Sequence, residues 1–264
     1  MVGAEPLLTT QTINSCRNLL FSLKDSSLSH PQIASRIHRH AYEMLNNPDP
    51  FLNLKMQGNT EAVKVCRDVR TGLSSFKDYV LASVIGNTFD YGVKGHSVTS
   101  NFSAFFRQEF RNGLVIDHTD HILPLTTRVV YLCDNCGEIV FDRLLIQYLK
   151  SQGSHITLAV KARPILNDAT LKDAQMFGLD RLVDCFTTNC DGAEIGLCPE
   201  DATPALSNAI SHCTLIIAKG MANFESLFER NDLPPVAYLM AAKCQPVANE
   251  AGVPLGSKIA LLRE

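Results

Sequence analysis

Acidic and amide side chains follow directly after a short apolar segment in the middle of the chain. Residues 129–133 are apolar, aromatic or β-branched, which predicts a buried strand. Asp134 and Asn135 come next, and an apolar-periodic helix is predicted over 139–149. Oxygen ligands at the carboxyl end of a parallel strand, beside a helix N-terminus, lie where open α/β sheets bind ligands. An Asx turn with a helix cap would use the same two residues, so this segment alone leaves both interpretations open.

Two further predicted strands end in polar residues of the same kind. The strand predicted over 155–160 is followed by a loop that contains Asp168, and the strand over 214–219 ends at Lys219 and Gly220. Because the carboxyl ends of parallel strands meet at one edge of a sheet, these residues should gather there. Carboxylate and amide oxygens suit hard ions such as magnesium and manganese, while a lysine and a glycine turn suit phosphate. The sequence therefore predicts a site for a hard metal ion and a phosphate group.

The two parts of the chain differ in their predicted elements. Up to about residue 125 the apolar spacing predicts helices and no convincing strand; beyond it, strands and helices alternate. We expect an α/β fold, a three-layer α/β/α sandwich with a mostly parallel doubly wound sheet. Residues 1–125 would form an N-terminal helical subdomain and 126–264 the metal- and phosphate-binding domain, in one integrated unit. The other predicted helices are a first one opening at Ser29, then 51–69, 76–85, 102–110, 171–177 and 205–211, and the other strands are 182–186 and 236–241.

Composition excludes several classes of protein. The 264 residues carry a formal net charge of −3, and no basic run interleaved with aromatic residues suggests a nucleic-acid partner. No apolar stretch approaches the about 18 residues that span a bilayer. Residues 1–10 lack the basic flank and apolar core of a signal peptide, so we expect a cytoplasmic protein with no membrane partner.

Nine cysteines are scattered along the chain, and Cys133 and Cys136 form a C-x-x-C pair. No second C-x-x-C completes a zinc site, and the odd total fits reduced thiols in the cytoplasm. Most of the cysteines are expected to be small buried apolar residues. A redox role for the pair stays an open alternative.

Familiar nucleotide motifs are absent from the sequence. It contains neither G-x-x-x-x-G-K nor G-x-G-x-x-G, which argues against a P-loop or dinucleotide fold and against a methyltransferase or other nucleotide-cofactor enzyme.

Asp134 could act as a nucleophile, as in haloacid-dehalogenase-like phosphatases, but that class needs a second aspartate two residues later, where this chain has Cys136. A non-catalytic protein that binds a phosphometabolite could use the same ligands and remains an alternative.

Six short strings, in order along most of the chain, resemble the metal-dependent damage-control phosphatases, long catalogued as domain of unknown function 89, in their stand-alone microbial branch. The strings are D-P-F-x-x-x-K-x-x-x-N (49–59), G-N-x-x-D-x-G (86–92), D-N-x-G-E (134–138), N-D-A-T (167–170), K-G-x-x-N-F-E (219–225) and K-C-x-P-V-A (243–248). The resemblance implies an α/β/α catalytic domain with a helical N-terminal portion. It further implies hydrolysis of phosphomonoesters of small, damaged or side-product metabolites, with a divalent manganese, nickel, cobalt or magnesium ion.

The resemblance also assigns roles to individual residues. Asp134, Asn135 and Asp168 match the metal ligands, and Glu138 matches a carboxylate on the substrate or water side; these four form the expected catalytic set. The expected substrate and phosphate contacts are Asn87, Asp90, Lys219, Gly220, Asn223 and Lys243. Helix capping for Asn87 and Asp90, and a surface position for Lys243, are the plain alternatives. Asn59 could equally lie on a solvated helix face.

Two segments depart from the family pattern. Relatives in this branch tend to begin with a C-x-x-C pair, whereas only Cys16 stands near that position here. Relatives also tend to carry Thr-Gly and Pro-Gly turns where this chain has Thr-Thr-Asn-Cys-Asp-Gly-Ala-Glu-Ile-Gly over 187–196. Substrate contacts in that segment are expected to differ, and substrate identity and oligomeric state do not follow from the sequence.

Overall fold

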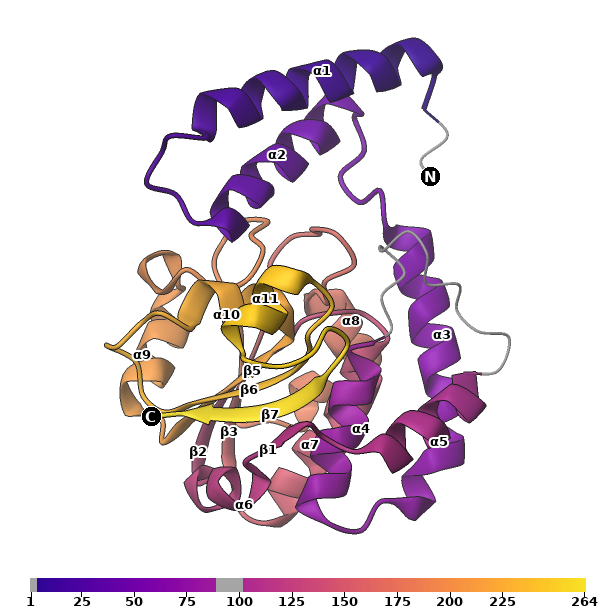
Figure 1. The fold of residues 1–264 in the computed structure, drawn as a ribbon, viewed down its shortest axis with the longest axis vertical. Coiled ribbons are helices and arrows are strands. Elements are labelled where there is room, and N and C mark those ends of the chain that lie inside the picture. The colour runs from indigo at the N-terminus through magenta and orange to yellow at the C-terminus, as the bar shows by residue number, and fades with distance from the viewer. Residues whose placement is uncertain (1–3, 89–101) are drawn as a thin grey trace.

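A computed structural model describes residues 4–88 and 102–264 (Figure 1). In these residues seven strands form one sheet in the order β1-β7-β6-β5-β2-β3-β4. The strands are β1 (Ile116–Asp117), β2 (Arg128–Leu132), β3 (His155–Val160), β4 (Cys185–Thr188), β5 (Leu215–Lys219), β6 (Val236–Ala241) and β7 (Lys258–Arg263). The α-helices are α1 (Pro6–Leu23), α2 (His30–Met44), α3 (Leu52–Val69), α4 (Phe76–Gly86), α5 (Phe102–Asn112), α6 (Thr119–Ile122), α7 (Glu138–Ser151), α8 (Leu171–Met176), α9 (Pro204–His212), α10 (Gly220–Leu227) and α11 (Gln245–Glu250).

The strand order creates a switch point between β2 and β5. From β2 the chain proceeds outward through β3 to β4, whereas from β5 it proceeds to β6 on the other side. Every neighbouring pair is parallel except β6 and β7, which are antiparallel. Ligands of open α/β sheets bind in the crevice at such a reversal, beyond the carboxyl ends of the strands. The predicted doubly wound, mostly parallel sheet is confirmed.

Alternating strand residues build two apolar layers, one on each face of the sheet. Tyr131 and Leu158 point into a cluster with residues of α3, α4, α5 and α7. Their neighbours Leu132 and Ala159 point into a second cluster with residues of α9, α10 and α11. The predicted α/β/α sandwich follows from this period-2 alternation between two helical layers.

Helices α1 and α2 form a hairpin that lies apart from the two layers, across the end of the sheet near α10 and α11 (Figure 1). Ser29 caps α2 through a capping box with Gln32, as the Ser-His-Pro opening predicts. Ser35 accepts a hydrogen bond from the Ile195 amide at 2.8 Å, and the Tyr42 hydroxyl accepts one from the Leu166 amide at 3.0 Å. The hairpin thus packs onto the loops that follow β3 and β4.

The expectation that no strand occurs before residue 125 is wrong. Strand β1 is only two residues long and forms by pairing with β7, which local periodicity cannot show. Apolar residues of α4 and α7 also belong to one core cluster, so the segments 1–125 and 126–264 share a hydrophobic core. The boundary at residue 125 stays a prediction. No described helix has the length and apolar character needed to cross a membrane.

Candidate active site

Two loops at the carboxyl edge of the sheet are joined by backbone hydrogen bonds. The Ala169 amide donates to the Asp134 carbonyl at 2.8 Å, and the Cys136 amide donates to the Asn167 carbonyl at 2.8 Å. Asn135 and Asp168 form an isolated antiparallel bridge between these segments. The loop after β2 and the loop after β3 therefore hold their acidic residues side by side, as expected for residues that follow neighbouring parallel strands.

The Asp134 carboxylate is buried beneath two amide side chains. Its Oδ2 accepts hydrogen bonds from Asn135 Nδ2 at 2.6 Å and from Asn87 Nδ2 at 3.0 Å. Asn87 is the C-cap residue of α4, so its backbone has the capping role while its side chain reaches the site. The N-cap residue of α7 is Gly137, and neither Asp134 nor Asn135 caps this helix through its side chain. These contacts favour a role in the site over the helix-cap interpretation.

Negative charge is concentrated around Asp134. Burial, and then the carboxylates of Glu138 and Asp168, raise the pKa of Asp134 well above its usual value. Lys243 and Lys161 oppose this shift of the Asp134 pKa, which places both lysines within electrostatic reach. A group of carboxylates that destabilise one another's charged forms is an electrostatic environment that favours a cation.

Glu138 begins α7 and is inaccessible to solvent. Its Oε2 accepts a hydrogen bond from Asn87 Nδ2 at 2.7 Å, and its Oε1 pairs with the Lys219 ammonium at 2.5 Å. The same ammonium contacts Asp142 Oδ1 at 2.8 Å. Burial by itself lowers the pKa of Lys219, but the carboxylates of Asp142 and Glu138 raise it overall. Lys219 is therefore a buried cation inside a ring of protein oxygens.

Gly220 allows the Asp134 side chain to approach the end of β5. Its φ is +76°, and a Cβ built on it would lie 1.8 Å from Asp134 Oδ2. Gly220 is also the first residue of α10, so that helix begins directly beside the acidic group. Asn223, one turn later, donates to the Lys219 carbonyl at 2.8 Å and to the Cys133 carbonyl at 3.5 Å. Asn223 thus links the end of β5 to the residue that follows β2 through hydrogen bonds.

Lys161 is a site residue that the sequence did not single out. It is 2% exposed, donates to the Gly196 carbonyl at 2.7 Å, and lies 3.6 Å from Asp168 Oδ2. Asn189 donates to the same Gly196 carbonyl at 3.0 Å. The segment that departs from the family pattern therefore reaches the site through these contacts. The signal for Lys161 was its place immediately after the predicted strand 155–160.

Asn59 joins the helical layer to the site. It is buried, and its Oδ1 accepts a hydrogen bond from the Gly137 amide at 2.7 Å. Its Nδ2 lies 3.4 Å from Asp173 Oδ1, and the other oxygen of Asp173 accepts from the Thr170 amide and hydroxyl. The solvated-face interpretation of Asn59 is wrong, because its side chain connects the loops that carry Asp134 and Asp168.

Lys243 lies two residues beyond the end of β6 and is half-buried. Its ammonium favours the charged form of Asp134, so it belongs to the same charge cluster. Asp90, the remaining predicted contact, lies outside the described residues. Together the structure assembles Asn87, Asp134, Asn135, Glu138, Asp168, Lys219, Gly220, Asn223 and Lys243 around one edge of the sheet.

Cys133 and Cys136 are both buried free thiols beside these residues. Burial raises the pKa of each thiol well above its usual value, which disfavours the reactive thiolate. Their environment is that of small apolar side chains packed in the core.

The donor chemistry of the site is suited to a hard divalent cation. Asp134 and Asp168 would supply carboxylate oxygens and Asn135 an amide oxygen, and the loop bridge holds these residues together. In the described part of the chain, no three histidine, cysteine, aspartate or glutamate side chains converge as a metal cluster. Two carboxylates and one amide would leave coordination positions for water and substrate, which is the pattern of magnesium sites.

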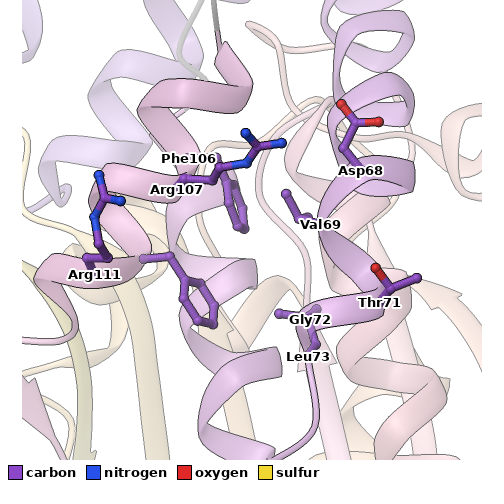
Figure 2. A pocket seen from close by; sticks show the side chains of 9 residues that line it. Asp68, Val69, Thr71, Gly72, Leu73, Phe106, Arg107 and Arg111 are labelled. Atoms are coloured by element: carbon purple, nitrogen blue, oxygen red, sulfur yellow. The ribbon is translucent and has the colours of Figure 1, made fainter.

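A separate surface pocket lies between the end of α3 and α5 (Figure 2). It has a volume of about 390 Å³, and Arg107, Arg111 and Asp68 stand around it. Its lining contains none of the predicted site residues, so it is separate from the site at the sheet edge.

Comparison with known proteins places the chain in a family. The profile of the damage-control phosphatase ARMT1-like domain matches residues 4–259. The chain belongs to this damage-control phosphatase family. It is 38% identical over 263 residues to a damage-control phosphatase of Archaeoglobus fulgidus, covering 97% of this chain and 91% of that protein. It is also 32% identical to a damage-control phosphatase of Pyrococcus horikoshii, covering 88% of this chain and 81% of the relative.

A solved structure shares the fold over the whole chain. The crystal structure of a DUF89 family protein from Pyrococcus horikoshii superposes with a TM-score of 0.91 at 27% sequence identity. The match covers 100% of this chain and 92% of the other. The family resemblance and the fold expected from the sequence are therefore confirmed.

Proposed function

We propose that this member of the damage-control phosphatase family is a metal-dependent phosphomonoester hydrolase acting on small phosphorylated metabolites. The observation that carries the proposal is the buried group of carboxylates at the switch point of the sheet, where backbone hydrogen bonds and the Asn135–Asp168 bridge join the loops that carry Asp134 and Asp168. Lysines border this group, as a site for both a cation and a phosphate requires. The names of the two relatives above support the reaction class.

In this proposal Asp134, Asn135 and Asp168 would hold one divalent ion, of manganese, nickel, cobalt or magnesium. When bound, the ion would polarise a phosphate oxygen and lower the pKa of a coordinated water. Asn135 donates to Asp134 through its amide nitrogen, so it would present its oxygen to the ion after rotation of the amide.

The remaining residues would position the reacting groups and neutralise the charge of the phosphate. Glu138 has no exposed surface, so it would act on the substrate or water side through Asn87 and Asn135, which contact one of its oxygens. Lys243, half-buried and within electrostatic reach of Asp134, would contact the phosphoryl group from beyond the end of β6. Amides in the first turn of α10 have no intrahelical partner and offer further donors near Gly220.

Hydrolysis of p-nitrophenyl phosphate tests this proposal. The protein is stripped with EDTA, assayed, and assayed again after addition of manganese, cobalt, nickel or magnesium. We expect turnover to be lost on stripping and restored by at least one of these ions. Unchanged turnover after complete stripping would contradict the metal dependence.

The same experiment separates the alternative of a non-catalytic binding protein. Such a protein would bind phosphate esters in a metal-dependent way and release no p-nitrophenol. A panel of sugar phosphates and phosphopantetheine derivatives would then identify the substrate class.

A further inference from the structure

The Lys219 ammonium is enclosed by oxygen atoms of the protein. It lies 2.5 Å from Glu138 Oε1, 2.8 Å from Asp142 Oδ1 and 2.6 Å from Ser83 Oγ, and the Ser83 carbonyl is a further acceptor at 3.3 Å. Its side chain has no solvent-exposed surface. A lysine ammonium has three N–H donors. Three close acceptors in the protein use all of them, so no donor remains for a phosphate oxygen.

Asp142 is the second carboxylate on this lysine. It lies four residues after Glu138 on α7, which places both acids on the same side of the helix. Its Oδ1 accepts hydrogen bonds from the Tyr131 hydroxyl at 2.7 Å and from Ser83 Oγ at 2.7 Å, besides the contact with Lys219. Like Glu138, it has no exposed surface. Asp142 is therefore fixed by β2 and α4 and has no route to a substrate.

Glu138 connects this buried group with the acidic residues of the site. One oxygen faces Lys219, and the other accepts from Asn87 Nδ2 at 2.7 Å and from the Asn135 amide at 3.3 Å. Asn87 in turn donates to Asp134. A shift of Lys219 would therefore move Glu138, and with it the amides that hold Asp134.

We propose that Lys219 and Asp142, with Ser83 and Tyr131, are positioning residues that orient Glu138, and that Lys219 does not bind the phosphate of the substrate. Lys219 is the internal cation that fixes the Glu138 carboxylate, and Asp142 holds Lys219 in place. Outer contacts of this kind typically change activity by about 10–100-fold when removed. This inference rests on the proposed phosphatase function, and it leaves Lys243 as the lysine that contacts phosphate.

The test compares kinetics with phosphate binding in the metal-loaded protein. The variants are Ser83→Ala, Asp142→Asn and Lys219→Met, assayed with p-nitrophenyl phosphate, and the Kd for inorganic phosphate is measured by calorimetry. We expect kcat to fall about 10–100-fold in each variant, with the phosphate Kd within about 2-fold of wild type. A direct lysine–phosphate contact predicts instead a phosphate Kd weakened about 100-fold in Lys219→Met, as for loss of one charge contact worth about 3 kcal/mol.

Thr126→Ala is the matched control for Ser83→Ala. Thr126 is also a buried hydroxyl, donating to the Leu123 carbonyl at 2.8 Å, but it precedes β2 at the amino end of the sheet. We expect its kinetics to equal those of wild type. If Lys219→Met does not fold, the other two variants decide, because neither Ser83 nor Asp142 can reach a phosphate. A kcat within 2-fold of the control for both would overturn the proposal.

A readout without turnover separates failure of this inference from failure of the phosphatase function. The side-chain amide signals of Asn87 and Asn135 in nitrogen-15 NMR spectra report on the position of Glu138 Oε2. We expect both signals to shift in Ser83→Ala and to stay in place in Thr126→Ala. Unshifted signals would overturn the positioning role. If the wild-type protein hydrolyses no phosphate ester while Ser83→Ala still shows the shifts, only the proposed function is refuted.

Discussion

At the scale of single residues, the contact between Asp134 and Gly220 sets how closely two strand ends can approach. The Asp134 carboxylate occupies the space where any other residue at position 220 would have its Cβ. The positive φ of Gly220 is an independent reason for glycine at this position. The turn at Gly220, which the sequence predicted as a phosphate contact, therefore makes room for a predicted metal ligand.

Gly220→Ala should displace Asp134 and lower kcat/KM by about 100-fold, since a misplacement of about 1 Å commonly costs that much. Gly113→Ala is the matched control, because Gly113 has a φ of +71° but nothing within 4 Å of its Cβ position. Both variants have the cost of a left-handed alanine, about 1–2 kcal/mol. Steady-state kinetics of the two proteins measure the effect of the clash. Equal activity in both would contradict the geometric role of Gly220.

At the scale of elements, α3 positions two loops through one side chain. Asn59 links the Gly137 amide before α7 to Asp173, which fixes the start of α8 after the Asp168 loop. Gly137 has a φ of +81° and lies against the Gly58 backbone of the same helix. A helix from the first part of the chain thus supports a site whose predicted metal ligands come from the second part.

Asn59→Leu should destabilise the protein and slow its reaction. The Gly137 amide would be buried without an acceptor, at a cost of about 1–3 kcal/mol, and we expect activity to fall about 10-fold or more. Urea unfolding and kinetics measure the two effects. Asn18→Leu, at an exposed position of α1, is the control. The linking role of Asn59 is refuted if both variants behave alike.

Several elements could be predicted from local sequence, and others could not. Strands β3 and β6 have the predicted bounds, because each is an apolar run enclosed by polar or turn residues. Strand β4 begins at Cys185, not at Leu182, because pairing with β3 sets its register. Helix α1 was missed because some of its apolar residues, such as Leu7 and Phe21, are exposed and give no clear stripe.

Some site residues could likewise be predicted from local sequence, and others could not. Asp134, Asn135 and Asp168 could be found because they follow predicted strands, where parallel sheets place their ligand groups. Ser83 and Asp142 lie inside helices and have no local signature. Their importance depends on the packing of α4 against α7 beside β5, which only the three-dimensional structure provides.

At the scale of the whole molecule, the proposed metal should stabilise the folded chain, because the ion binds loops that are joined only in the native state. An ion at 100 times its Kd would add about 2.7 kcal/mol to the free energy of unfolding, which corresponds to a rise in Tm of about 5–10 °C. Thermal melts with manganese, cobalt, nickel or magnesium measure this rise. Asp168→Ala should abolish it, and wild-type protein that melts at one temperature with and without every ion would argue against the site.

The central claim is that the strand-end carboxylates carry out phosphomonoester hydrolysis, and Asp134→Ala tests it most directly. The side chain lies at the sheet edge and belongs to neither apolar cluster, so its removal should leave the metal-free protein folded. The decisive measurement is kcat/KM for p-nitrophenyl phosphate with saturating metal, for Asp134→Ala and wild type purified in parallel. We predict a loss of at least about 1,000-fold, equivalent to about 4 kcal/mol of transition-state stabilisation. A folded Asp134→Ala protein with kcat/KM within 10-fold of wild type would contradict the account.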